Sequence, residues 1–468
     1  MARMRLIQPP LVQPRWRQLT LPVVGAEFGA YFDVQICDEN IEPLDASDVD
    51  LVGITCHVYN APRAFQIAHQ FRERGIPVLM GGTFPTIAPD LVKKHCDSVV
   101  VGELEGQTEE IVADAGSKIL KPIYRAATPP PLTHSRMPNF GLLKNEQYLH
   151  YNFPLETSRG CRHACQFCTA GLLFPTARTR SLEDIARDLQ QYDHGQVELI
   201  DENFLMDPGF FDRVLPLLQQ SAIPGWFGQT TIADLATDST LPRRLAVARC
   251  RSLFVGLETI SESGLQSINK SWSRPELLAQ LVKRFQEQGV LIQVGLIVGL
   301  DSDQAEIFEQ TRAFLEEAQV HAVSITFLHH YPGRPEFESL RRAGRLVSTD
   351  WQCYDGDRPV IEPRSITVKN LESEVDRFLR RFYSLRSILG RALHRGILLH
   401  PTQLLNHVSA NLALGGYYRR MQKDWQDEQA PIRRYGGGEA GPSKLELRLA
   451  NANLALLDWL WRPTGRRP

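Results

Sequence analysis

Two stretches of the chain alternate short apolar runs with segments in which apolar residues recur every three or four positions. In the first stretch, the runs at 49–56, 76–82 and 97–103 have apolar residues at successive positions, and a segment of helical period lies at 61–75. Successive apolar residues suit a strand that helices cover on both faces, as in a parallel sheet. This pattern predicts an α/β fold in which residues 1–125 form a doubly wound, Rossmann-like parallel sheet.

The second alternating stretch repeats a strand pattern followed by a helix pattern. Six such units predict a partial (β/α)6 barrel over residues 148–345, with its active site at the carboxyl ends of the strands. The expected strands are 154–158, 197–201, 226–231, 252–258, 291–300 and 322–328. The expected helices are 181–192, 208–220, 240–248, 274–289 and 303–318.

The remaining segments are a linker and a tail. Residues 126–147 begin in a proline-rich stretch without hydrophobic period, which is typical of a linker between domains. Residues 346–468 are expected to form a helical C-terminal domain that includes a flexible loop at 433–444. Its basic face is either a solvated helix surface or a surface for an amphiphilic substrate or anionic lipid. The arginines of that face are Arg377, Arg380, Arg381, Arg386 and Arg391.

Composition restricts the partners of the chain. It is 43% hydrophobic and 23% charged with a formal net charge of −2, as in a globular protein without a basic field for nucleic acid. No signal peptide and no apolar run of about 18 residues is seen. Scattered cysteines in such a chain suggest a reducing compartment, so a cytoplasmic location is expected, with peripheral membrane contact as an option.

Three of the 8 cysteines lie within one short segment, Cys161, Cys165 and Cys168, at the end of the first barrel strand. A structural zinc site needs four ligands, and only His163 lies nearby, so zinc is the less favoured alternative. An odd number of cysteines argues against disulfides. Cubane iron–sulfur clusters normally use four cysteine thiolates. Three would leave one iron open to a substrate or cofactor.

The spacing Cys-x3-Cys-x2-Cys, with Phe167 before the last cysteine, resembles the signature of the radical S-adenosylmethionine (SAM) superfamily. The resemblance implies that the three cysteines hold a 4Fe–4S cluster whose fourth iron is chelated by SAM. One electron, from a donor such as flavodoxin or ferredoxin, would cleave SAM to methionine and a 5′-deoxyadenosyl radical. That radical would abstract hydrogen from the substrate. The resemblance also places Phe167 among the residues that bind the cofactors.

Acidic residues at two further strand ends match the same family. The resemblance implies that Asp201 or Glu202 receives the ammonium group of SAM and that Glu258 lies near its ribose. Structural alternatives remain open: Asp201 as a helix cap, and Glu258 as a surface acid. Gln229 is either a SAM contact or a polar group satisfied within the sheet.

The fifth and sixth strand ends also resemble family motifs. Gly295, Ile297 and Gly299 match the glycine motif that approaches the adenine, although Asp301 and Asp303 stand only near the position of its usual terminal acid. The segment after the sixth strand resembles the family's proline–glycine turn. We expect its polar residues to face the substrate and take part in catalysis: His330, Tyr331 and Arg334.

The N-terminal sheet resembles the cobalamin-binding-type domain that precedes the radical SAM core in one subfamily. The resembling segments are "DLVGITC", "GGTFPTIAPDL" and "SVVVGELEG". No Asp-x-His-x2-Gly motif marks a histidine ligand to cobalt, and the domain is shortened. The residues expected to line the cofactor are Thr55, Gly81, Gly82, Thr83 and Glu103.

Together these features predict a radical SAM enzyme that carries out cobalamin-dependent methyl transfer to an unactivated carbon. The alternative is cobalamin-independent C–C coupling, cyclisation or rearrangement of a lipid, tetrapyrrole or natural product. A non-enzymatic iron–sulfur or zinc-binding scaffold is a further alternative. We expect the carboxyl faces of the two sheets to oppose one another, with a small-molecule or lipid-like substrate between them.

Overall fold

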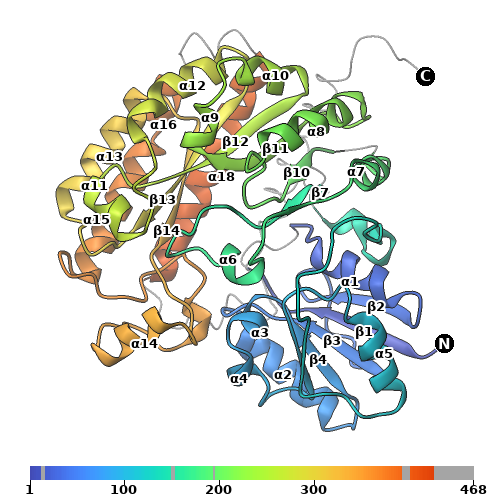
Figure 1. Ribbon diagram of the computed structural model, residues 1–468. Coiled ribbons are helices and arrows are strands. Elements are labelled where there is room, and N and C mark those ends of the chain that lie inside the picture. The colour runs from blue at the N-terminus through green and yellow to red at the C-terminus, as the bar shows by residue number, and fades with distance from the viewer. Residues whose placement is uncertain (12–15, 149–152, 193–194, 393–400, 426–468) are drawn as a thin grey trace.

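The computed structural model of the protein describes residues 1–11, 16–148, 153–192, 195–392 and 401–425. Two parallel sheets, each flanked by helices, lie one below the other in Figure 1. The smaller, N-terminal body is blue, and the larger one runs from green to orange. The loop expected at 433–444 lies outside the described residues, and the predicted domain limits stay predictions.

The first sheet has six parallel strands in the order β2-β1-β3-β4-β5-β6. Buried side chains form one hydrophobic cluster on each of its faces, one under α1 and α5, the other under α2, α3 and α4. This arrangement confirms the doubly wound prediction, although β6 was not expected. The elements are β1 Arg3–Gln8, α1 Thr20–Phe28, β2 Asp33–Asp38, β3 Leu51–Thr55, α2 Ala61–Arg72, β4 Val78–Gly81, α3 Thr83–Ile87, α4 Pro89–Val92, β5 Ser98–Val101, α5 Thr108–Gly116 and β6 Ile123–Arg125.

The order of the first sheet reverses at β1, which lies between β2 and β3. Chain connections leave such a reversal point in opposite directions, so a crevice opens beyond the carboxyl ends of the strands there. The ends of β3, β4 and β5 carry the threonine, glycine and glutamate residues predicted to line a cofactor site. The topology therefore places those residues where a doubly wound sheet binds ligands.

The second sheet has six parallel strands in the order β14-β13-β12-β11-β10-β7, each paired with its neighbour in sequence. This open order confirms the partial barrel. The strands are β7 Phe153–Leu155, β10 Val197–Leu199, β11 Trp226–Thr231, β12 Cys250–Glu258, β13 Leu291–Val298 and β14 Ala322–Phe327. The intervening helices are α6 Ala170–Leu173, α7 Leu182–Leu189, α8 Pro208–Gln220, α9 Ile232–Leu235, α10 Leu241–Val247, α11 Glu262–Ser267, α12 Leu278–Gln286 and α13 Ala305–Glu317.

The predicted first barrel strand is divided in two. Residues 153–155 join the barrel sheet, whereas β8 (Ser158–Arg159) pairs antiparallel with β9 (Arg178–Thr179) outside it. The cysteine loop lies between β8 and α6, so the small hairpin frames it.

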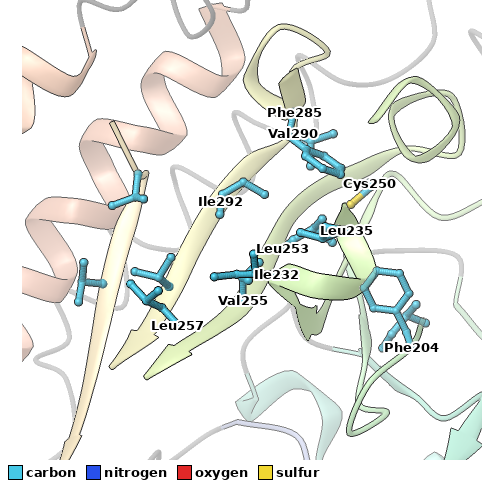
Figure 2. Close-up of a cluster of buried hydrophobic side chains, with 14 of the residues drawn as sticks. Phe204, Ile232, Leu235, Cys250, Leu253, Val255, Leu257, Phe285, Val290 and Ile292 are labelled. Carbon is cyan, nitrogen blue, oxygen red and sulfur yellow. The ribbon is translucent and has the colours of Figure 1, made fainter. Parts of the chain in front are cut away.

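The barrel core packs strands β11 to β14 against their helices. Figure 2 shows Leu253, Val255 and Leu257 of β12 beside Ile292 of β13. Phe285 of α12 has no exposed surface. Alternate residues of β12 are buried, because successive side chains of a strand point to opposite faces.

Helices of the C-terminal segment cover the edge of the barrel at β14. On α15 (Val368–Phe382), the buried face has the predicted helical spacing: Leu371, Val375, Phe378, Leu379 and Phe382. The hydroxyl of Tyr383 donates to Val323 O (2.6 Å), and the hydroxyl of Tyr418 accepts from Ile325 N (3.1 Å). The other helices are α14 Pro335–Arg342, α16 Leu385–Ala392 and α18 Pro401–Trp425. None of the described helices has the length and apolar composition needed to cross a membrane.

Replacing Phe285 with Ala should lower the free energy of unfolding by about 3–5 kcal/mol, because it leaves a cavity in the packed core. Chemical denaturation of the two proteins measures the difference. The control is Val247→Ala, at a side chain 55% exposed, which should change stability by less than about 0.5 kcal/mol. Equal losses in both variants would contradict this packing.

Candidate active site

A cavity of about 310 Å³ lies at the carboxyl ends of the first sheet. It contains all five residues predicted there: Thr55, Gly81, Gly82, Thr83 and Glu103. One part of its wall is apolar and comes from the sheet and α1: Met4, Leu6, Val24, Phe28, Leu79 and Val100. The other part is charged and comes partly from the barrel: Glu105, Glu156, Arg159 and Glu202. The cavity is therefore shared between the two sheets.

Two glycines form part of the cavity wall with bare backbone. Gly82 has a φ of 104°, and a Cβ there would lie 3.1 Å from the backbone N and O of Cys56. Gly81 has ordinary backbone, and its nearest neighbour would be the Cβ of Val100 at 3.8 Å. A side chain at Gly81 would thus meet little protein, and it would occupy the cavity instead.

The three loop cysteines are partly exposed, whereas the other five are buried. Backbone bonds fix the loop: Cys168 N donates to Cys165 O (3.1 Å), and Gln166 N donates to Ile268 O (3.0 Å). The Asn269 amide donates to Ala164 O (2.8 Å). Among the residues that the structure describes, no three His, Cys, Asp or Glu side chains gather around one metal ion. In a cubane cluster each thiolate binds its own iron, so such convergence is not required.

Asp201 is fully buried, and its carboxylate is used within the barrel. It accepts from Thr157 N (2.8 Å), Thr157 Oγ1 (2.5 Å) and Ser158 Oγ (2.5 Å). Burial raises the pKa of Asp201 to about 6. Its backbone carbonyl accepts from the Gln229 amide (3.1 Å), which is the sheet-bonded role considered for that residue. Both residues therefore make structural contacts in this arrangement.

Glu202 points in another direction. Its Oε2 accepts from Gly160 N (2.8 Å), and the side chain lines the shared cavity. Burial raises the pKa of Glu202 to about 7. Of the two acids at the end of the second barrel strand, Glu202 is the one placed beside both the cysteine loop and the cavity.

Glu258 ends the fourth barrel strand in a left-handed conformation, with a φ of 64°. Its Oε1 lies 2.6 Å from Lys270 Nζ, and the same ammonium donates to Gly256 O (3.0 Å). The side chains of this pair are 11% and 4% exposed, so Glu258 is not a surface acid.

Lys270 was missed in the sequence, as was the aromatic stack beside it. Its Nζ lies 5.4 Å from the ring centroid of Trp272, and that ring stacks on His163 of the cysteine loop at 3.7 Å. Burial raises the pKa of Cys165, and Lys270, which lowers it, has the largest effect among the charged groups nearby. A single lysine in a turn has no periodic signal, so only the fold brings it to the loop.

The glycine turn after the fifth strand is held by Asp303. Its Oδ2 accepts from Gly299 N (2.9 Å) and Leu300 N (3.0 Å), and Gly299 has a φ of 86°. Asp301 instead pairs with Arg345 and Arg364 of the following segment. The acid that departs from the family pattern thus still organises the turn.

Close packing explains two further positions of the same motif. A Cβ at Gly295 would lie 2.6 Å from the ring of Phe254, so β12 and β13 need a glycine there. Ile297 packs with Phe167 in a small hydrophobic cluster beside the cysteine loop. The predicted cofactor residues on β13 and in the loop are therefore neighbours.

The segment after β14 brings its polar residues toward the loop. Burial, followed by the charge of Cys168, raises the pKa of Tyr331 to about 12. His330 lines a hollow of about 390 Å³ that also includes Gln166, and burial lowers its pKa to about 4. Arg334 is paired with Glu336 at 3.1 Å. His330 and Tyr331 are thus close to the cysteine loop, while the charge of Arg334 is used in its own turn.

The two bodies touch around the cysteine loop. Helix α3 packs near α6, which directly follows the cysteines. A Cβ at Gly333 would lie 2.8 Å from the Cβ of Ala88, so the turn after β14 rests on the first domain. These contacts agree with the expected apposition of the two carboxyl faces (Figure 1).

Comparison with known proteins identifies the class to which this site belongs. Residues 155–350 match the family model of the radical SAM superfamily, and the chain is an enzyme with a radical SAM domain. A curated relative, bacteriochlorophyllide d C-12(1)-methyltransferase of Chlorobaculum tepidum, is 26% identical over 80% of this chain and 84% of its own length.

Two solved structures extend the likeness to the N-terminal domain. The radical SAM methyltransferase TsrM from Kitasatospora setae, with cobalamin and a [4Fe-4S] cluster bound, aligns at a TM-score of 0.61 and 16% identity, over 98% of this chain and 100% of that one. The cobalamin-dependent enzyme OxsB, with aqua-cobalamin bound, aligns at a TM-score of 0.65 and 14% identity, over 98% of this chain and 80% of that one. The fold of this chain is thus similar to that of these two enzymes over nearly its whole length.

Burial raises the pKa of Asp303 to about 6, although two backbone N–H groups oppose the shift. Between about pH 4 and pH 6 the folded chain therefore binds more protons at this site than the unfolded chain, and this contribution to stability falls as pH rises. In Asp303→Asn, which keeps an acceptor oxygen, that loss should disappear. The free energy of unfolding of Asp303→Asn, measured relative to that of the unaltered protein by chemical denaturation, should be about 3 kcal/mol higher at pH 7 than at pH 4. An unchanged difference between the proteins would contradict it.

Proposed function

We propose that the protein transfers a methyl group to an unactivated carbon of a small molecule, using a 4Fe–4S cluster, SAM and cobalamin. The observation that carries the proposal is the shared cavity, whose wall combines the cofactor-type end of the first sheet with Glu202 and the strand before the cysteine loop. The methyltransferase name of the curated relative supports the reaction type. Its substrate suggests a tetrapyrrole as one substrate class to test.

The donor set of the cysteine loop fits an iron–sulfur cluster with one open iron. Cys161, Cys165 and Cys168 would hold it, and Ala170 N already donates to Cys168 Sγ at 3.4 Å, as backbone amides do to cluster thiolates. Bound there, the cluster would supply the electron for reductive cleavage of SAM.

Charged groups around the loop suit the methionine end of SAM. Glu202 is the better candidate for its ammonium group, since the oxygens of Asp201 are already bonded. Glu258 keeps its proposed place near the ribose, where its bond to Lys270 would fix the direction of its side chain. A buried charge-assisted bond is strong because no water competes for it.

The cavity fits cobalamin in two respects. A wall of bare backbone at Gly81 and Gly82 lets a flat ring approach closely, and the apolar part between the sheet and α1 suits an inserted nucleotide tail. Bound there, cobalamin would supply the methyl group. The chain itself would exclude water by closing the first domain over the loop through α3 and the turn at Gly333.

His330 and Tyr331 are proposed to face the substrate. The imidazole is neutral at physiological pH, and the phenol stays protonated, so both can hydrogen-bond a substrate without adding charge. Arg334 is a weaker candidate because Glu336 already pairs with it.

An electron donor of the flavodoxin or ferredoxin type and a peripheral membrane contact are also proposed. Leu385 and Leu389 of α16 are 66% and 53% exposed, which supports a contact with a lipid surface. Two nearby arginines, Arg377 and Arg380, are paired with acids on their own helix, which weakens an electrostatic contribution. A cytoplasmic location goes with this proposal.

Replacing Cys161, Cys165 or Cys168 with Ala should abolish iron–sulfur absorption after anaerobic reconstitution, together with 5′-deoxyadenosine formation from SAM under reducing conditions. The matched control is Cys250→Ala, a buried cysteine of β12, which should keep both. A protein that lacked all three loop cysteines but bound four irons would rule out the assignment.

Gly81→Leu should fill the cavity without forcing the backbone, because Gly81 has no close neighbour there. Cobalamin binding, followed by visible absorption during titration, should weaken at least about tenfold, whereas cleavage of SAM should persist. The control is Gly116→Leu at the end of α5, where a Cβ would meet nothing within 4 Å. If unaltered protein binds no cobalamin yet still modifies a substrate, the cobalamin-independent alternative replaces the proposal.

A further inference from the structure

One arginine joins the cysteine loop to the first domain. Arg159 ends β8, two residues before Cys161, and its side chain is 9% exposed. Its guanidinium contacts three carboxylates: Glu103 Oε2 at 2.5 Å, Glu105 Oε1 at 2.7 Å and Glu156 Oε1 at 2.8 Å. Each guanidinium nitrogen that bears hydrogen thus has its own partner.

Two of those carboxylates belong to the first domain. Glu103 and Glu105 follow β5, and both line the shared cavity. The other oxygen of Glu103 accepts from Arg178 Nη2 (2.5 Å), on the strand that pairs with β8. The hairpin that frames the cysteine loop is therefore held to the cavity wall by two arginines.

These charges are largely removed from water. Side-chain exposure is 6% for Glu103, 17% for Glu105 and 13% for Glu156. Burial alone would raise the pKa of Glu105, but the charge and hydrogen bonds of Arg159 hold it below its ordinary value. Removing Arg159 would leave three buried carboxylates with Arg178 as the one remaining arginine of the cluster, which is costly.

We propose that this cluster of Arg159 with Glu103, Glu105 and Glu156 couples the filling of the cavity to the position of the cysteine loop. A ligand in the cavity excludes the water that still reaches Glu105, which is 17% exposed, and so strengthens its hold on Arg159. Since Arg159 is two residues from Cys161, the loop becomes more rigid when the cavity is filled. Arg159 is thus a positioning residue. The inference rests on the proposed function only in taking cobalamin as the ligand.

Hydrogen exchange of peptides from the loop, residues 159–173, tests the coupling in cluster-containing protein with and without hydroxocobalamin. Hydroxocobalamin should slow exchange of the loop about tenfold in the unaltered protein. A strengthened hydrogen bond to a charged group would reduce local opening of the loop by about this factor. Arg159→Lys keeps the charge but cannot reach three carboxylates, and Glu105→Gln removes one partner. Exchange of each variant is compared at a hydroxocobalamin concentration that saturates it, as followed by visible absorption, and both variants should then lose most of the protection.

The matched control is Arg187→Lys on α7. Arg187 also bonds two carboxylates, of Asp184 and Asp188, but it does not line the cavity. The Arg187→Lys variant should keep the protection of the loop against hydrogen exchange. A second readout is the electron paramagnetic resonance of the reduced cluster, whose relaxation should respond to bound cobalamin in the control and less in Arg159→Lys.

The outcomes separate this inference from the proposed function. Binding of hydroxocobalamin without protection of the loop, or with equal protection in Arg159→Lys and Glu105→Gln, overturns the coupling and leaves the proposed function standing. Failure of the unaltered protein to bind hydroxocobalamin overturns both.

Discussion

The hydrogen bonds of the Asp201 carboxylate fix the place at which the cysteine loop begins. They tie the backbone and hydroxyl of Thr157 and the hydroxyl of Ser158 to the end of the second barrel strand. The chain therefore leaves the sheet after Leu155 and turns into the β8–β9 hairpin. A buried carboxylate with three donors is satisfied without a cation, which frees the neighbouring Glu202 for the cavity.

From that anchor, polar contacts continue into the other domain. Glu202 holds Gly160, and Arg159 holds Glu103 and Glu105 beyond β5. Neither sheet alone encloses the cavity, because both domains contribute apolar and charged side chains to its wall, among them Phe174 and Glu202 of the barrel. The cavity is consequently a property of the docked pair of domains.

Sequence patterns predicted the elements whose burial is regular. The strand 226–231 and the helix 208–220 agree residue for residue with β11 and α8, since both have clear periods and defined ends. The first barrel strand was predicted too long, because its break depends on a carboxylate more than 40 residues away, at Asp201. Strand β6 has three residues and little pattern of its own.

Residues of the candidate site could likewise be predicted only where a local sequence pattern marks them. Residues in short local motifs, such as the three cysteines and the glycines after β4, could be proposed from spacing. Lys270, Trp272 and Arg159 could not, because their importance lies in partners that are distant in sequence: Glu258, His163 and Glu103. Conversely, Asp201 and Arg334 looked available in the sequence, yet the fold gives each a partner already.

An open barrel has a cost that a closed one avoids, because its last strand presents unpaired peptide groups. In this protein, the tyrosine hydroxyls of Tyr383 and Tyr418 occupy peptide groups of Val323 and Ile325 on β14. The helices that carry them also shield that strand from solvent. A strand from another molecule would have to displace these tyrosines before it could add to the sheet, so the C-terminal helices protect the enzyme against edge-to-edge aggregation.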